Sequence, residues 1–200
     1  MNKPAPPPAA PSTRPQIGLT AQLLTGLGMC VVAAPFIWLQ KDPKAVFTGP
    51  VPILSQLLVG HVLALVAALA SYALFRLTKE SASTARTVET YARLDLRGLN
   101  PLWISIAAAV GEEMLFRAAL QPFVGVWIAS LLFVATHVPV YRFRKLDRAT
   151  LVQAGGIFLC SVVLGFVFAR VGLVAAMLVH LWIDVVGLLA VRSMLQRRAI

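Results

Sequence analysis

Long hydrophobic runs separated by short polar stretches dominate the pattern of this 200-residue chain. Leu, Ala and Val fill the runs, which lack the period-two alternation of a membrane-barrel strand. A helix needs about 20 apolar residues to cross roughly 30 Å of hydrocarbon, and each run is close to that length. The pattern therefore predicts an all-α, polytopic membrane bundle of about six transmembrane helices, over residues 17–39, 53–77, 101–120, 122–140, 151–169 and 171–192.

The polar stretches define the rest of the organisation. Residues 1–16 hold six of the 13 prolines and predict a disordered, Pro-rich cytoplasmic tail. Residues 78–100 carry alternating charge and predict an amphipathic helix on the membrane surface. The hydrophobic runs leave little room for a soluble domain, so residues 17–200 are expected to form one membrane-embedded domain.

Composition and charge support a membrane location. Hydrophobic residues make up 58% of the chain and charged residues 13%, against about 25% charged in soluble domains. If both ends and the loops 78–100 and 141–150 share one side, that side carries fourteen Lys and Arg residues, and the other side carries Lys41, Lys44 and Arg170. This bias predicts that both termini are cytoplasmic.

The same bias indicates the partner of the basic residues. The net charge of +10 suits contact with an anionic lipid bilayer. The basic loops lack the interleaved aromatic residues of a base-stacking surface, so we expect no nucleic-acid partner. The compact chain and the Pro-rich tail favour an integral protein of a bacterial inner membrane.

Ionisable residues inside the apolar runs are the candidates for chemistry. An ionisable group at membrane depth is usually retained because it forms pairs, relays protons or reacts. Three of the eight acidic residues and all three histidines lie in such runs: Glu112, Glu113, Asp184, His61, His137 and His180.

Helical spacing separates their roles. Glu113 and Arg117 are four residues apart, so they meet on one helix face and are expected to pair. Glu112 points about 100° away and is therefore the free carboxylate. Gly111, just before it, would allow a neighbouring helix to approach closely.

Two further pairs repeat this spacing. Phe133 precedes His137 by four residues, and His180 precedes Asp184 by four. Ionised Glu112 and Asp184 would leave two unbalanced charges in an apolar site. Protonated carboxylates, protonated histidines or a bound divalent cation could balance them.

Together these motifs resemble the CAAX-protease and bacteriocin-processing family, also called the ABI or type II CAAX prenyl endopeptidase family. The resemblance rests on Glu-Glu-x-x-x-Arg, Phe-x-x-x-His and His-x-x-x-Asp in this order, and covers residues 101–190. It implies an intramembrane endopeptidase that cleaves a membrane-associated protein or peptide.

The resemblance also implies roles for the motif residues. Glu112 and His137 would activate the attacking water, Glu113 and Arg117 would hold the helix, and His180 with position 184 would stabilise the oxyanion. Family members with Asn at the last position can donate an amide hydrogen bond, whereas Asp184 donates only when protonated.

The cofactor stays open at this point. The family is described both as metal-independent glutamic proteases and as metalloproteases, and we favour a site without a cofactor. Zn²⁺ or another divalent cation is the alternative, with ligands from Glu112, His137, His180 and Asp184.

Two other functions fit buried carboxylates and histidines. One is a proton-coupled carrier, although the chain shows no inverted pair of broken helices. The other is a non-catalytic membrane protein, such as an immunity or scaffold protein, which should tolerate loss of Glu112.

Four remaining features carry smaller expectations. His61 has no acidic or histidine neighbour one turn away, so we expect a hydrogen bond to another helix. Gly155-Gly156 and Gly165 indicate close helix packing. Trp182 lies away from the predicted helix ends and is expected to line the site.

Overall fold

The computed structural model describes residues 17–141, 143 and 147–198, and the predicted tail at 1–16 lies outside the described residues. The described residues form helices joined by short loops, with one isolated bridge between Ile17 and Leu94. In chain order the helices are α1 (Leu19–Trp38), α2 (Ala45–Thr48), α3 (Ile53–Thr78), α4 (Ala82–Tyr91), α5 (Asn100–Glu112), the π-helix η1 (Glu113–Leu120), α6 (Gln121–Tyr141), α7 (Arg148–Arg170) and α8 (Leu173–Arg198).

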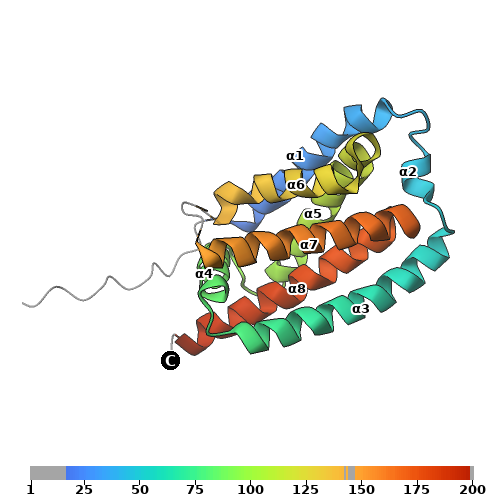
Figure 1. Cartoon of the computed structure of the whole chain (residues 1–200). Helices are drawn as coiled ribbons and strands as arrows, with labels where there is room; N and C mark the ends of the chain where they lie inside the picture. The colour runs from blue at the N-terminus through green and yellow to red at the C-terminus, as the bar shows by residue number, and fades with distance from the viewer. Residues whose placement is uncertain (1–16, 142, 144–146, 199–200) are drawn as a thin grey trace, which may run out of the picture.

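Five helical stretches among the described residues are long and apolar enough to cross a membrane. The predicted polytopic helical bundle is therefore confirmed, although about six helices were expected. The third and fourth expected spans form one stretch of 42 residues, Asn100–Tyr141. This stretch folds back on itself at Gly125, whose φ of 77° suits glycine and few other residues (Figure 1).

The predicted break between these two spans was placed too early. The sequence pattern put it near residue 121, just before Pro122, whereas helical backbone continues through η1 and Pro122 as far as Gly125. Pro122 therefore lies in the last turn before the break at Gly125 and does not itself end the helical backbone.

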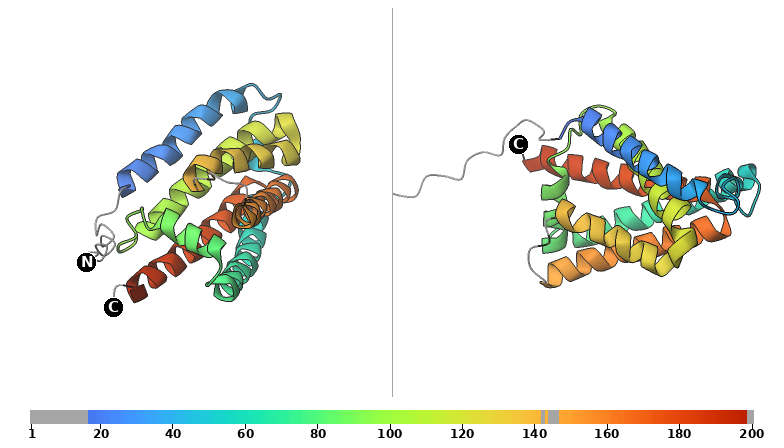
Figure 2. Two further views of the ribbon diagram at one scale, coloured as in Figure 1. Left: turned by 60° about the vertical axis from the view of Figure 1, so that its left-hand side comes forward. Right: turned by 90° about the horizontal axis from the view of Figure 1, so that it is seen from above.

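The helices pack around α5 and α8. Helix α5 contacts α1 and α8, while α8 also contacts α3 and α7, and α6 packs on η1 and α7. Figure 2 shows α3 and α8 running along one flank and α1 along the opposite flank. The functional groups described below come from the helices that meet between these flanks.

Small residues bring the central helices together. A Cβ atom on Gly111 would lie 2.7 Å from the carbonyl oxygen of Gly26, so α1 and α5 touch backbone to backbone as expected. Gly165 likewise lies against Gln121. The same expectation was wrong for Gly155 and Gly156, because a Cβ atom on either would meet nothing within 4 Å.

Helix α4 crosses one end of the bundle. Ser81 caps its first turn by accepting a hydrogen bond from the Thr84 N–H, and Val88 is fully buried beneath it. Arg86 forms an ion pair of 3.1 Å with Asp147, the N-cap of α7. Hydrogen bonds from Thr150 and Arg86 lower the pKa of Asp147 to about 2, so this cap is charged at neutral pH. A helix in the predicted amphipathic segment is thus confirmed over Ala82–Tyr91.

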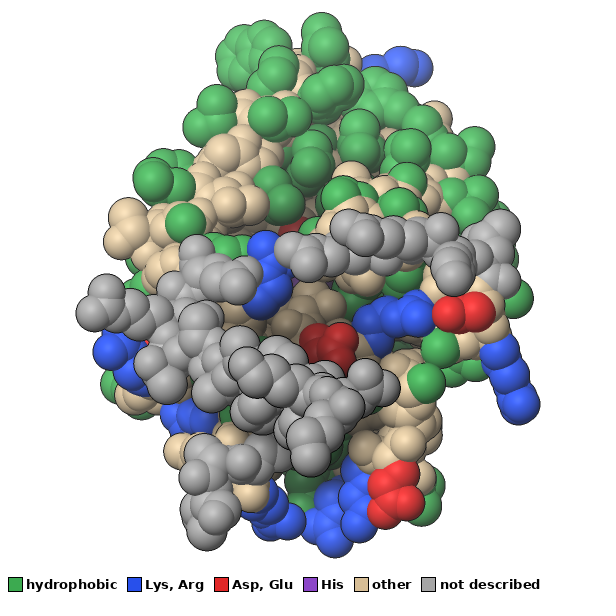
Figure 3. All heavy atoms as spheres, turned by 90° about the vertical axis from the view of Figure 1, so that its left-hand side faces the viewer, with side chains coloured by type: hydrophobic (Ala, Val, Ile, Leu, Met, Phe, Trp, Pro, Cys, Tyr) green, Lys and Arg blue, Asp and Glu red, His purple; other side chains and the backbone are tan. Residues whose placement is uncertain are grey.

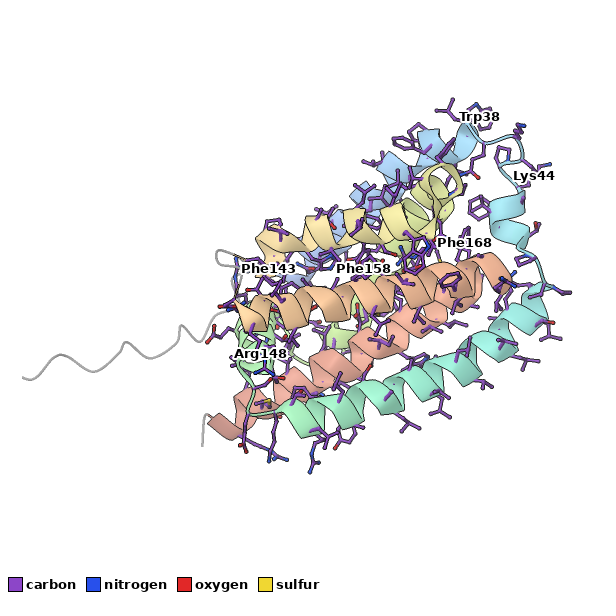
Figure 4. All side chains as sticks on the ribbon, viewed as in Figure 1. Trp38, Lys44, Phe143, Arg148, Phe158 and Phe168 are labelled. Atoms are coloured by element: carbon purple, nitrogen blue, oxygen red, sulfur yellow. The ribbon has the colours of Figure 1, made fainter. Side chains whose placement is uncertain are left out.

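Polar and apolar side chains are segregated on the surface. Figure 3 views the end of the bundle near α4, where Lys and Arg side chains gather around acidic ones while hydrophobic side chains cover the adjoining flank. In Figure 4, Arg148 and Phe143 lie at this end, and Trp38 and Lys44 lie at the opposite end. This distribution is typical of an integral membrane protein.

Candidate active site

A fully buried ion pair lies at the junction of α5 and η1. The Nε atom of Arg117 is 3.2 Å from Oε2 of Glu113, and neither side chain is exposed. Arg117 also donates from Nη2 to the Ser161 hydroxyl on α7, at 3.1 Å. The predicted pairing of Glu113 with Arg117 is confirmed, and Ser161 extends it to a third helix.

The π-helical backbone starts at Glu113. A π-helix adds residues to a turn and is rare, appearing most often as short segments at functional sites. Here it runs over Glu113–Leu120 and carries both partners of the ion pair. It was not predicted from the sequence, because eight residues of π-helix leave the hydrophobic pattern almost unchanged.

His180 connects the ion pair to the two other acidic residues. Its Nδ1 is 2.8 Å from Oε1 of Glu113. A carboxylate that pairs with a guanidinium accepts hydrogen bonds, so Nδ1 carries the proton of this contact. Its Nε2 faces Oε2 of Glu112 at 3.8 Å and Oδ2 of Asp184 at 3.5 Å.

The two remaining carboxylates differ in access. The Asp184 side chain is 30% exposed and the Glu112 side chain 15%, whereas Glu113 has no exposure. The Oε2 atom of Glu112 is buried without a hydrogen-bond partner among the described residues. Glu112 thus points away from the Glu113–Arg117 pair and faces His180, while Asp184 lies on the open side of the site.

The Phe-x-x-x-His motif forms the wall of the site. Phe133 is buried and its ring centroid lies 5.3 Å from the guanidinium carbon of Arg117 and 6.3 Å from the ring of His180. The ring of His137 stacks on Phe133 at 4.5 Å. Phe133 therefore separates the ion pair from His137 and shields it from water.

His137 is oriented by its own helix. Its Nδ1 lies 2.8 Å from the carbonyl oxygen of Phe133, so Nδ1 donates and Nε2 is left to accept. Within the part of the chain that the structure describes, His137 makes no hydrogen bond to Glu112, its predicted partner. Joint action of the two groups therefore needs a water or a substrate atom between them.

An aromatic chain links this wall to α4. Tyr141 stacks on His137 with ring centroids 6.1 Å apart, and its hydroxyl lies 2.8 Å from that of Tyr91. Neither tyrosine was predicted from the sequence. Tyr141 lies four residues beyond His137, which is the spacing that brings side chains onto one helix face and could have indicated it.

The side chains of the site are of the types that bind a divalent cation, but they are not arranged around a common position. Imidazole and carboxylate groups are typical zinc ligands. Among the described residues, however, no three His, Cys, Asp or Glu side chains are arranged around a common point. With one His180 nitrogen bonded to Glu113, a cation would have to draw on His180 Nε2, Glu112 and Asp184, and then on His137.

Two other sequence predictions were wrong. The Nδ1 of His61 contacts the Leu57 carbonyl of its own helix at 2.7 Å, not another helix. Trp182 lies with His61 and Tyr72 in a groove on the outer flank, not in the site. Both lie on faces of α3 and α8 that the hydrophobic pattern could not distinguish, because those helices are apolar all round.

Comparison with known proteins identifies the same part of the chain. Residues 97–186 match the family model described as "Type II CAAX prenyl endopeptidase Rce1-like". The family resemblance is therefore confirmed for this segment, which runs from the loop after α4 to just beyond Asp184 and lacks α1 and α3. The matched segment contains all three motifs on which the resemblance rests.

A curated relative matches over a similar length. The Bacillus subtilis (strain 168) protein described as "Uncharacterized protein YpbD" is 36% identical over 86 residues. These residues are 42% of this chain and 42% of the relative, so the chain spans less than half of that protein's length. No solved structure matches the chain.

Proposed function

We propose that this protein is an intramembrane endopeptidase that hydrolyses a peptide bond of a membrane-associated protein or peptide. One observation supports this most directly. His180 lies between the ion-paired Glu113 and two less buried carboxylates, Glu112 and Asp184, with all three carboxylates within 3.8 Å of its ring nitrogens. Such a cluster between apolar helices suits proton transfer and the stabilisation of a developing charge.

In this proposal Glu112 and His137 activate the attacking water. The unpartnered Oε2 of Glu112 is the site for a proton taken from water, and the free Nε2 of His137 accepts the second hydrogen bond of that water. The water then attacks the carbonyl carbon of the peptide bond. The proton on Glu112 passes to the leaving nitrogen as the bond breaks.

In the same proposal His180 and Asp184 stabilise the negative charge on the oxygen of the tetrahedral intermediate. With Nδ1 bonded to Glu113, a protonated Nε2 of His180 can donate to the oxygen of the tetrahedral intermediate. Asp184, 3.5 Å from that nitrogen, either orients the ring or, when protonated, donates as well. Glu113, Arg117 and Ser161 hold His180 in place through the hydrogen bonds described above.

The test is a matched pair of carboxamide variants. The substrate is first identified as the peptide that accumulates uncut in cells lacking the protein, and its cleavage is then followed with purified protein in liposomes. Glu112→Gln keeps the side-chain shape but removes the base, so the rate is expected to fall by a factor of about 10² to 10⁴. Glu89→Gln, an exposed carboxylate on α4, is the control and should cleave normally.

The outcomes separate the proposal from its alternatives. Near-normal cleavage by a folded Glu112→Gln variant would exclude Glu112 as the base. A wild-type protein that cleaves no peptide but whose cellular effect survives Glu112→Gln would indicate a non-catalytic scaffold. A protein that moves protons across liposomes without cleaving peptides would indicate a carrier.

A further inference from the structure

An apolar groove runs along the outer flank of the bundle between α3 and α8. It encloses about 460 Å³, and its α3 side extends from His61 to Tyr72 while Trp182 and Val186 form its α8 side. The two helices touch closely above it, where a Cβ atom on Gly60 would lie 2.9 Å from the Cα of Ala175. The groove is lined almost entirely by apolar side chains of these two helices, among them Ala64, Leu65, Ala68 and Leu69.

The dimensions of the groove match one half of a bilayer. His61 and Tyr72 are eleven positions apart on one helix, which is about 16 Å along its axis at roughly 1.5 Å per residue. Half of a hydrocarbon core of about 30 Å is about 15 Å. The groove can therefore hold an acyl chain of one leaflet along most of its length.

A basic side chain lies at the outer end of the groove. Arg76 follows Tyr72 by one turn, donates from Nη1 to the Tyr72 hydroxyl at 3.1 Å, and holds its guanidinium carbon 5.9 Å from the centre of the Tyr72 ring. Within the described residues no carboxylate lies within ion-pair distance of Arg76. Arg76 is exposed two residues from the end of α3, where an apolar span meets the lipid headgroups.

We propose that this groove binds one anionic phospholipid, with an acyl chain between α3 and α8 and the phosphate on Arg76. The tyrosine hydroxyl fixes the guanidinium over the end of the groove, so the charge and the apolar channel are aligned for a single molecule. His61 lines the same groove, and its Nδ1 donates to the Leu57 carbonyl of its own helix. This inference does not depend on the proposed protease activity.

Trp182 provides a direct probe of the groove. The full-length chain with Trp38, Trp103 and Trp127 changed to Phe keeps Trp182 alone, and its fluorescence is measured in vesicles. Phosphatidylglycerol or phosphatidylcholine with brominated acyl chains is added at equal mole fractions, since bromine quenches tryptophan only on contact. One basic residue near an anionic lipid predicts about a fivefold preference for phosphatidylglycerol.

Two matched variants decide the role of Arg76. Arg76→Gln is expected to remove the preference, while Arg148→Gln, an exposed arginine at the same end of the bundle, is expected to keep it. Retention of phosphatidylglycerol by the otherwise unchanged chain, measured by native mass spectrometry, should fall about fivefold with Arg76→Gln alone. Equal quenching by both lipids, or a preference that survives Arg76→Gln, would overturn the proposal.

Discussion

Arg117 is the residue on which the folded site depends most. Its guanidinium is fully buried and contacts Glu113 on its own helix, Ser161 on α7 and the face of Phe133 on α6. A buried charge that loses its partner stays desolvated and uncompensated. The ion pair therefore fixes the position of Glu113, and through it the proton on His180.

Arg117→Ala should consequently reduce the amount of folded protein as well as the activity. Removal of one partner of a buried pair destabilises a protein by roughly 3–5 kcal/mol, measured here by thermal unfolding in detergent. Arg97→Ala is the control, because Arg97 is 82% exposed in its pair with Asp95 and should leave the unfolding temperature close to that of the wild type. Equal unfolding temperatures for all three proteins would show that the buried pair does not stabilise the fold.

Asp184 decides between the two mechanisms at the site. On the metal-free mechanism, Asp184→Asn should keep or raise activity, because an amide beside His180 donates a hydrogen bond without needing a proton. On the metal mechanism, the same change should weaken metal binding and activity together, and strong chelators should inactivate the wild type. Elemental analysis of the purified protein, with pH–rate profiles of both forms, distinguishes them. Stoichiometric zinc with an inactive Asn variant would contradict the metal-free mechanism that we favour.

At the scale of elements, the sequence predicted where helices lie better than how they meet. Apolar runs locate α1, α3, α7 and α8 to within a few residues because length and hydropathy alone determine a membrane span. Contacts depend on which face turns inward, and an apolar helix in lipid has no polar face to show this. Gly26 and Gly165 lie in close contact with a neighbouring helix, whereas Gly155 and Gly156 have nothing within 4 Å of an added Cβ atom. All four glycines lie in apolar stretches of the sequence, so the sequence does not distinguish them.

In the site too, contacts within one helix were predicted and contacts between helices were not. Spacing of four residues predicted the pairs Glu113–Arg117 and His180–Asp184, since these are local to one helix. The contact of His180 with Glu113 and the role of Ser161 could not be predicted, because they join residues 67 and 44 positions apart. The turn at Gly125 was missed because apolar residues continue on both sides of Gly125, so the hydrophobic pattern does not mark it.

The contact between α1 and α5 can be tested with two glycines of one helix. A methyl group on Gly26 would fall on the backbone carbonyl of Ala107, whereas one on Gly28 would meet nothing within 4 Å. Gly26→Ala should therefore separate the helices and destabilise the protein by about 1–3 kcal/mol, while Gly28→Ala should not. The unfolding temperatures of both variants in detergent measure this. A Gly26→Ala protein as stable as Gly28→Ala would show that α1 and α5 do not touch there.

At the scale of the whole molecule, the charge distribution orients the bundle. Arg148 and the basic residues near α4 lie at one end, and Lys44 lies at the other (Figures 3 and 4). His137 is four residues from the end of α6 at Tyr141, about 6 Å along the helix axis from the Arg148 end. The orientation of the chain therefore determines which compartment supplies water and substrate to the site.

We expect the Arg148 end to face the cytoplasm, because the sequence segments assigned to that side carry fourteen Lys and Arg residues and those assigned to the other carry only Lys41, Lys44 and Arg170. In a chain with Cys30 and Cys160 changed to Ala, Lys44→Cys should react with a membrane-impermeant thiol reagent in intact cells. Arg148→Cys should react only after the membrane is permeabilised, although both Lys44 and Arg148 are exposed at helix ends. The reverse pattern would place His137 near the outer face, and the proposed protease would then have to take its peptides from outside the cell.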